Sequence, residues 1–404
     1  MSTSSDTGVA GTPEAADLLA RRRDAIEESG WGARFHLFQP RNLSLWVYLL
    51  LVVLGARELY QIAVPIAPVF ADADIAGVAS AGTFCLLFLL FLHHADRYER
   101  TPALLAATAF IGGGIGAVWA MAMPGNAAVM SLYSKIFGQV WAADWNAGLT
   151  APFVEESAKG AVFVLMLGLA PFVIRTVYDG LIVGAFVGLG FQVLEDMLYG
   201  QNSAYSNFGV DQVGAVLHTF VIRSLSGISS HAMYTAIFAA GIVYLVGTRA
   251  QPRRVGRGLL LMASAMLIHG LWDSMLALSN ANGFVVTALM AGITVVSFVV
   301  LFVALRWGSH RERGWLRDVL APEVANGTLT EVELVALTGE QSRRRQDRKA
   351  AIKGRADGVS RRREKHVLAA ALDLAHDLSE SGGEDNDAVA HSRKEIARLR
   401  HRHA

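Results

Sequence analysis

The chain has 404 residues, of which 53% are hydrophobic and only 18% are charged, and its formal net charge is +1. A soluble domain usually carries about 25% charged residues, so this composition favours an integral membrane protein. Its single cysteine, Cys85, excludes an intrachain disulfide framework and a cysteine-based zinc site. We expect the lipid bilayer, and no nucleic acid, as a partner.

Residues 1–42 are predicted to be a disordered segment on the cytoplasmic side, because their first 30 residues are rich in Ser, Thr, Gly and Ala. The first apolar run begins only after Arg21, Arg22, Arg23, Arg34 and Arg41. That arrangement is typical of a start-transfer anchor and a poor match to a signal peptide.

Residues 43–306 are predicted to form an all-α bundle of about eight transmembrane helices. A helix needs about 20 mostly apolar residues to cross a bilayer, because lipid cannot satisfy backbone polar groups. The apolar runs that meet this requirement lie at 44–66, 76–94, 103–123, 149–171, 179–200, 229–248, 258–278 and 284–306.

The basic residues predict the orientation of the bundle. Cytoplasmic loops carry an excess of Lys and Arg, and the loops 95–102, 172–178 and 248–257 hold most of those between the predicted spans. The remaining loops contain only Lys135 and Arg223. This pattern places both termini in the cytoplasm and predicts a multi-pass protein of a plasma membrane, which the Ala-, Gly- and Arg-rich usage suggests is bacterial.

Two segments lie outside the predicted spans and have a pattern of their own. Residues 307–404 are dense in charge and are predicted to be a flexible, partly helical cytoplasmic tail, with helical stretches at 330–350 and 362–380. Residues 213–226, which include His218 and Arg223, are apolar but too short to span. They are predicted to form a surface or re-entrant helix near a site mouth.

Ionisable residues occur in four of the predicted spans, and they share one depth. Counting from the end of each span that faces outward, most of them lie within about 3–10 Å of the extracytoplasmic boundary. The residues of this layer are Glu155, Glu156, Lys159, Glu195, Asp196, His231, His269 and Asp273.

Helical spacing brings some of these residues onto shared faces. Glu155 and Lys159 are four residues apart, as are His269 and Asp273, and such pairs meet on one side of a helix. Glu155 and the adjacent Glu156 diverge by about 100° around the axis, so they need not do the same job.

A glycine stripe predicts where the fifth span packs. Gly180, Gly184 and Gly188 repeat every four residues, which permits close helix contact. Phe191 and Glu195 continue the stripe, so we expect Glu195 to point into the bundle and away from lipid.

The polar layer is costly for a membrane protein. Each ionisable residue at the centre of a span costs about 2.5–3.5 kcal/mol on insertion scales. Taken singly, His269 reads as a packing residue and Glu155–Lys159 as a neutral structural pair. The coincidence of four helices at one depth favours a functional site.

One chemistry that fits is a zinc-dependent hydrolase. Zinc in catalytic sites takes three protein ligands and keeps a fourth position for water. The candidate metal ligands are Glu195, His231 and His269, with Asp273 as a ligand or as a partner behind one. One of Glu155 and Glu156 would then be the base, and the other a ligand or an orienting group. Lys159 would hold the base ionised or stabilise the oxyanion.

A second chemistry needs no metal, because a glutamate can activate water directly while histidines supply the proton and the oxyanion contact. No HExxH motif is present to separate the two.

The residues of this layer resemble the motifs of a known family. Pro152–Lys159, with the sequence PFVEESAK, looks like the EExxK motif of the PrsW intramembrane proteases, and Phe191–Glu195 looks like their FxxxE motif. Ser230–Thr235 is similar to the histidine motif of their next helix, and His269–Ser274 to their HxxxD-type motif. These motifs appear in the family's order over residues 44–306. The PrsW proteases are grouped with the CAAX-processing and bacteriocin-processing proteases.

The resemblance implies a membrane-embedded peptidase, usually classed as a metalloprotease, that cleaves membrane-anchored regulators such as anti-sigma factors. Roles carry over to the matching positions, which are Glu155, Glu156, Lys159, Glu195, His231, His269 and Asp273. The alternative is a non-enzymatic protein, either an ion- or proton-coupled transporter or a membrane binding or immunity factor. A convincing internal repeat, which transporters often show, is not apparent.

Overall fold

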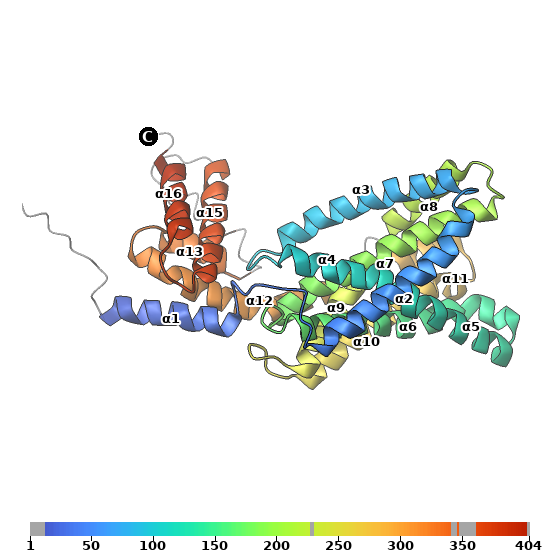
Figure 1. Cartoon of the computed structure of the whole chain (residues 1–404), viewed down its shortest axis with the longest axis horizontal. Coiled ribbons are helices and arrows are strands. Elements are labelled where there is room, and N and C mark those ends of the chain that lie inside the picture. The colour runs from blue at the N-terminus through green and yellow to red at the C-terminus, as the bar shows by residue number, and fades with distance from the viewer. Residues whose placement is uncertain (1–12, 227–229, 341–345, 347–360, 402–404) are drawn as a thin grey trace, which may run out of the picture. The chain divides into compact units, whose positions relative to one another are not determined.

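A computed structural model describes residues 13–226, 230–340, 346 and 361–401, and every regular element in that part of the chain is a helix (Figure 1). The chain divides into two compact units. The larger, here called the membrane unit, comprises Phe35–Asp96 and Thr101–Leu305. The smaller, here called the terminal unit, takes its described residues from Met1–Arg34, Arg97–Arg100 and Arg306–Ala404.

The membrane unit contains most of the helices. They are α2 (Leu43–Ile66), α3 (Ala71–Ala95), α4 (Ala103–Ile111), the π-helix η2 (Gly112–Ala122), α5 (Met123–Phe137), α6 (Gln139–Leu169), α7 (Val177–Ser206), α8 (Gln212–Ser226), α9 (His231–Val246), α10 (Val255–Asp273), α11 (Met275–Leu278) and the first part of α12 (Gly283–Ala325).

Six helical stretches in the described residues are long and apolar enough to cross a membrane: Leu43–Ile66, Ala71–Ala95, Ala103–Phe137, Val177–Ser206, Val255–Asp273 and Gly283–Ala325. Two more predicted spans coincide with α6 and α9. Helix α6 carries Glu155, Glu156 and Lys159, and α9 is apolar but has only 16 residues. The prediction of a polytopic helical bundle is therefore confirmed.

Helix α7 lies in the interior of this bundle, and its neighbours shield it. Of its most apolar window, 83% is buried, against 11% for α2 and 17% for α3 and α12, whose apolar side chains face outward. Thr176 caps its N-terminus by accepting a hydrogen bond from the Asp179 amide, and the Asp179 carboxylate accepts one from the Thr176 amide. The element that carries Glu195 is thus fixed at its start and along its length.

Residues 124–148, which connect two predicted spans, are mostly helical. Helix α5 runs to Phe137, and α6 begins at Gln139 after Gly138, whose φ of 87° reverses the chain. Polar residues lower the hydropathy of this stretch, but its two helices pair: the Tyr133 and Trp141 rings meet edge to face. This pairing extends the bundle beyond the span that hydropathy indicates.

The π-helix η2 packs closely against α7. A Cβ on Gly113 would lie 1.9 Å from the Val187 carbonyl oxygen of α7, and one on Gly190 of α7 would lie 2.0 Å from the oxygen of Phe110, which is in α4 just before η2. Only glycine allows the two backbones to come so close. A π-helix bonds residue i to i+5, which changes the face that later residues present and often marks a functional site.

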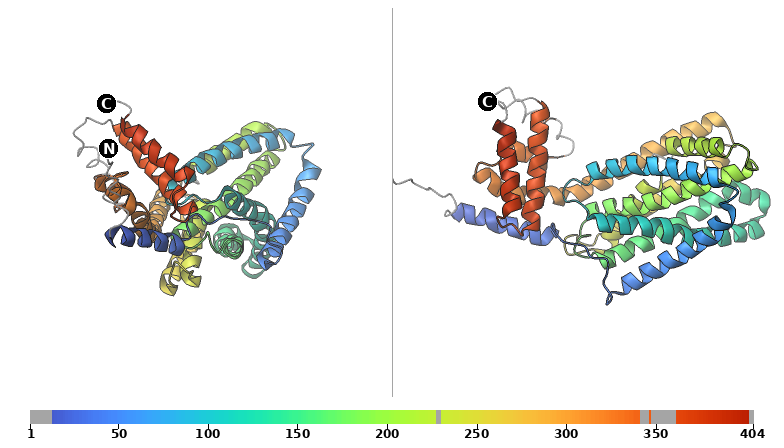
Figure 2. Two further views of the ribbon diagram at one scale, coloured as in Figure 1. Left: turned by 60° about the vertical axis from the view of Figure 1, so that its left-hand side comes forward. Right: turned by 45° about the horizontal axis from the view of Figure 1, so that its top comes forward.

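The terminal unit joins residues from both ends of the chain. It contains α1 (Pro13–Ser29), the last part of α12, α13 (Glu331–Thr338), and α15 (Arg361–Glu380) and α16 (Asp387–His401), which pack as an antiparallel pair (Figure 2). Residues 13–29 are therefore helical where the sequence predicts disorder. The buried Arg22 explains the difference, since its guanidinium lies 2.8 Å from Glu323, a partner 301 residues away.

Candidate active site

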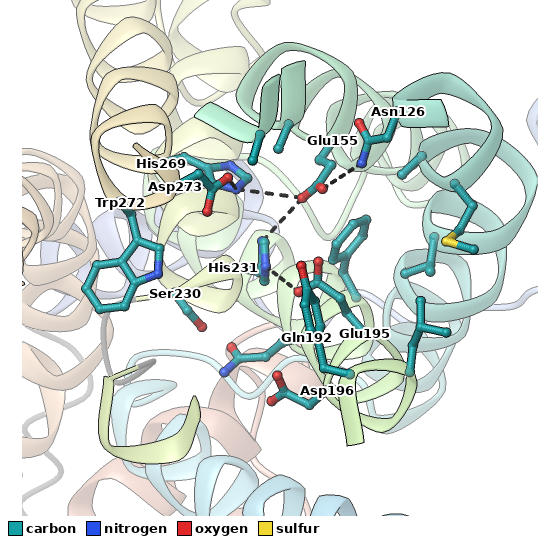
Figure 3. Close-up of a pocket in the computed structure, with 18 of the residues that line it drawn as sticks. Asn126, Glu155, Gln192, Glu195, Asp196, Ser230, His231, His269, Trp272 and Asp273 are labelled. Atoms are coloured by element: carbon teal, nitrogen blue, oxygen red, sulfur yellow. Dashed lines mark hydrogen bonds and ion pairs between the residues drawn. The ribbon is translucent and has the colours of Figure 1, made fainter. Parts of the chain in front are cut away.

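The ionisable residues of four helices converge inside the membrane unit. Glu155 comes from α6, Glu195 from α7, His231 from the first residue of α9, and His269 and Asp273 from the last turns of α10. Figure 3 shows their side chains pointing toward one another. The single layer that the sequence predicts is thus a single cluster in space.

Glycines bring these helices into contact at the cluster. A Cβ on Gly184 would lie 2.5 Å from that of Ala239, and one on Gly188 would lie 2.3 Å from the His231 carbonyl oxygen. The predicted packing stripe of α7 is therefore confirmed, with α9 as its partner. Similarly, a Cβ on Gly270, next to His269, would lie 2.9 Å from the Gly148 oxygen of α6.

Three buried side chains form the centre of the cluster, and we call Glu155, His231 and His269 the central trio. One possible metal-ligand atom from each lies within 4.8 Å of the other two. Glu155 Oε2 is 3.7 Å from both His231 Nδ1 and His269 Nε2. This oxygen is buried and makes no hydrogen bond with any described residue, whereas Glu155 Oε1 accepts one from Asn126 at 2.9 Å.

Behind the central trio, Glu156 and Lys159 form a fully buried ion pair, with Lys159 Nζ 2.6 Å from Glu156 Oε1. Lys159 Nζ also lies 2.9 Å from His231 Nδ1 and 4.3 Å from the centre of the Phe191 ring. Glu156 accepts a hydrogen bond from His269 Nδ1 at 3.1 Å. The adjacent glutamates thus have different surroundings, as their angular separation predicts.

Two further carboxylates, those of Glu195 and Asp273, also contact the histidine rings. His231 Nε2 donates to Glu195 Oε2 at 2.8 Å, and His269 Nε2 lies 3.3 Å from Asp273 Oδ2. Arg223, on α8, in turn donates to Glu195 at 2.9 Å and to Asp196. The predicted short helix at 213–226 is confirmed as α8, and it contributes a cation to the site.

A cavity of about 420 Å³ opens onto this cluster. It is lined by side chains of η2, α5, α6, α7, α8, α9 and α10. Among the lining residues are all three members of the central trio, Glu195, Asp273, Arg223 and Trp272. Carboxylates and imidazoles therefore face a space that can hold part of a substrate.

The donor set fits a metal ion. Histidines that bind metals usually have their other ring nitrogen held by a carboxylate. In the central trio, His231 Nε2 is held by Glu195 and His269 Nδ1 by Glu156. The other nitrogen of each ring faces Glu155 Oε2, where it also meets Lys159 Nζ in His231 and Asp273 Oδ2 in His269. The buried Glu155 oxygen, which has no hydrogen bond to any described residue, completes a Glu–His–His set that could hold a metal ion.

The structure brings together all seven residues that the sequence predicts for the site. The ligand roles predicted for Glu195 and Asp273 remain predictions, since both carboxylates contact ring nitrogens. Sequence reasoning did not single out Asn126, because the residue falls in a predicted loop and its partner lies on another helix. In the sequence, the only indication of a role for Asn126 is that its amide side chain lies just after the predicted span 103–123.

Comparison with known proteins places this site in a family. The family model for the PrsW family intramembrane metalloproteases matches residues 101–305, which include all seven predicted site residues. Over 217 residues, the chain is 30% identical to Protease PrsW of Bacillus subtilis (strain 168), an alignment that covers 51% of this chain and 83% of the relative. No solved structure matches the chain. The chain therefore belongs to the PrsW family of intramembrane metalloproteases and is an intramembrane endopeptidase.

Proposed function

We propose that the central trio is the peptidase site and holds Zn²⁺ through Glu155, His231 and His269. The observation that carries this proposal is the Glu155 oxygen, buried, without a hydrogen bond to any described residue and 3.7 Å from a nitrogen of each histidine. Three protein ligands with an open position are typical of catalytic zinc. When bound, the ion supplies a Lewis acid that activates water and polarises a carbonyl group.

The remaining carboxylates then take distinct roles. Glu195 and Asp273 line the cavity and lie beside the two histidines, so they are placed to accept a proton from the attacking water. Glu156 is completely buried, and its Oε1 is engaged by Lys159 and His269. It orients His269 and does not act as the base.

A second candidate mechanism has one observation in its favour. Lys159 Nζ lies 2.6 Å from Glu156, 2.9 Å from His231 Nδ1 and 3.8 Å from Glu155 Oε2. A lysine in that position supplies positive charge that a metal would otherwise supply. Glu155 would then activate water directly, without an ion.

The metal content of the purified full-length protein separates the two. Inductively coupled plasma mass spectrometry of the wild type, Glu155→Gln and His231→Ala is expected to find about one zinc per chain in the wild type only. His94→Ala is the control, because this histidine lies exposed near the end of α3. Zinc retained in His231→Ala would contradict the ligand set. A zinc-free wild type that still cleaves would establish the metal-free route.

For the substrate, we propose membrane-anchored regulatory proteins of the anti-sigma-factor type, cut near the extracytoplasmic side. Family membership supports a membrane protein as substrate, and the basic residues in the loops support cytoplasmic termini. Labelling of new protein N-termini in cells that make the wild type or Glu155→Gln tests this. Cleavage sites that require Glu155 should map beside spans of membrane proteins, and sites confined to soluble proteins would refute the assignment.

The proposed orientation has its own test. Cysteines introduced in the Cys85→Ser background at Phe208 and at Arg253, both exposed, should differ in labelling by a membrane-impermeant maleimide. Phe208→Cys is expected to react in intact cells and Arg253→Cys only after permeabilisation. The opposite pattern would invert the topology.

A further inference from the structure

Two asparagine side chains connect α5 and α6 through hydrogen bonds. Asn126, in the first turn of α5, donates from Nδ2 to Glu155 Oε1 at 2.9 Å. Asn146, on α6, donates to Met130 O at 3.4 Å and to Ser134 Oγ at 3.3 Å. Both asparagines are half-buried, but only Asn126 touches the central trio.

The Asn126 contact decides which way the Glu155 carboxylate turns. The terminal torsion of a glutamate is broad, so its two oxygens are not placed by rotamer preference alone. A hydrogen bond to Oε1 removes that freedom and leaves Oε2 between the two histidines. We propose that Asn126 is a positioning residue, which holds Glu155 in the orientation that the site needs. This inference rests on the proposed function of the central trio.

The backbone around Asn126 lies close to α6, which places the Asn126 side chain beside Glu155. The preceding residue, Gly125, lies so close to α6 that a Cβ would be 2.7 Å from Val154 Cγ1, beside Glu155. Upstream, the wide turns of η2 end at Ala122, only four residues before Asn126, and they set the face that this residue presents. Contacts of η2 with α7 fix that register, as Gly113 shows.

A positioning role predicts an effect on the site that exceeds any effect on folding. Partners that orient metal ligands typically change metal affinity by about 10–100-fold when they are removed. Asn126→Ala should therefore lower zinc affinity by about that factor while the protein keeps its fold. Asn126→Asp matches asparagine in shape but, when ionised, cannot donate to Glu155. It should lower zinc affinity at least as much as Asn126→Ala.

The experiment is a zinc titration of the full-length protein in detergent, in competition with a chromophoric chelator. The variants are Asn126→Ala, Asn126→Asp, Glu155→Gln and the matched control Asn146→Ala, each checked by thermal unfolding. We expect weaker zinc binding in both Asn126 variants, none in Glu155→Gln, and wild-type binding in Asn146→Ala. That pattern supports the inference.

The other outcomes are distinguishable. Wild-type affinity in both Asn126 variants, with binding lost in Glu155→Gln, would overturn the positioning role and leave the proposed site standing. Equal losses in Asn126→Ala and Asn146→Ala would assign the effect to α5–α6 packing, which also overturns it. No zinc in the wild type, or full binding in Glu155→Gln, would refute the proposed zinc site itself.

Discussion

Lys159 Nζ lies 2.6 Å from Glu156 Oε1, and neither side chain has any exposed surface. Because the two residues are three apart on α6, one turn of helix places a full ion pair inside a membrane-spanning bundle. Glu156 extends the pair to His269. His231 and His269 of the central trio therefore contact an ion pair that is shielded from solvent.

Removing one member of this pair should be more damaging than removing both. We expect Lys159→Met to destabilise the protein by about 3–5 kcal/mol, because Glu156 is left as an uncompensated buried charge. The double variant Lys159→Met/Glu156→Gln should recover part of that loss. Thermal unfolding in detergent measures both. A single variant as stable as the wild type would mean that the pair contributes nothing to the fold.

Arg223 is expected to influence activity through Glu195. Arg223→Ala removes the donor that holds Glu195 against His231 and should lower cleavage by about 10–100-fold, the usual effect of losing an orienting partner. Arg223→Lys keeps the positive charge but loses the planar guanidinium group, so its cleavage activity should lie between that of the wild type and that of Arg223→Ala. Cleavage is scored on the protein substrates found by N-terminal labelling. The exposed Arg249→Ala is the control, and equal losses in both would remove Arg223 from the site.

The α7–α9 contact predicts a sharp difference between two glycines. Gly188→Ala would place a Cβ 2.3 Å from the His231 carbonyl oxygen, so α9 must shift. Overpacking of this kind costs about 1–3 kcal/mol and here would also displace a proposed zinc ligand. Gly82→Ala is the matched control, since nothing lies within 4 Å of its Cβ position. Unfolding temperature and zinc content should fall in the first variant only.

Zinc itself should stabilise the folded protein. A ligand that binds only the native state at about 100 times its Kd adds about 2.7 kcal/mol. Chelation should therefore lower the unfolding temperature of the wild type, and added zinc should restore it. Glu155→Gln should show neither change. An unfolding temperature that ignores zinc in the wild type would favour the metal-free mechanism.

The helices and the residues that form the cluster could be predicted because both depend on local patterns. Apolar runs set the spans, and the spacing of Gly180, Gly184 and Gly188 predicts the face on which α7 packs. The contact between Asn126 and Glu155 could not be predicted in this way. It depends on how α5 crosses α6 and on the π-helix η2, and no periodicity in the sequence predicts either of these.

The same limit explains two other differences. Spacing cannot tell which carboxylate turns an oxygen toward both histidines, and in the structure this carboxylate is that of Glu155. The composition of the N-terminal segment favours disorder, but Arg22 is buried against Glu323. A contact between two residues that are 301 positions apart cannot be predicted from local sequence patterns.

The terminal unit constrains how often the chain can cross the bilayer. Arg22 of α1 and Glu323 of α12 lie in one unit, and so does Arg100, which is 2.9 Å from Asp373. We expect a unit of polar helices to occupy one side of a membrane, and the number of crossings between Arg100 and the end of α12 should then be even. Four helical stretches in that interval meet the length and composition requirement, and the two predicted spans that coincide with α6 and α9 do not. On this expectation α6 and α9, which carry Glu155 and His231, cross the bilayer together or not at all.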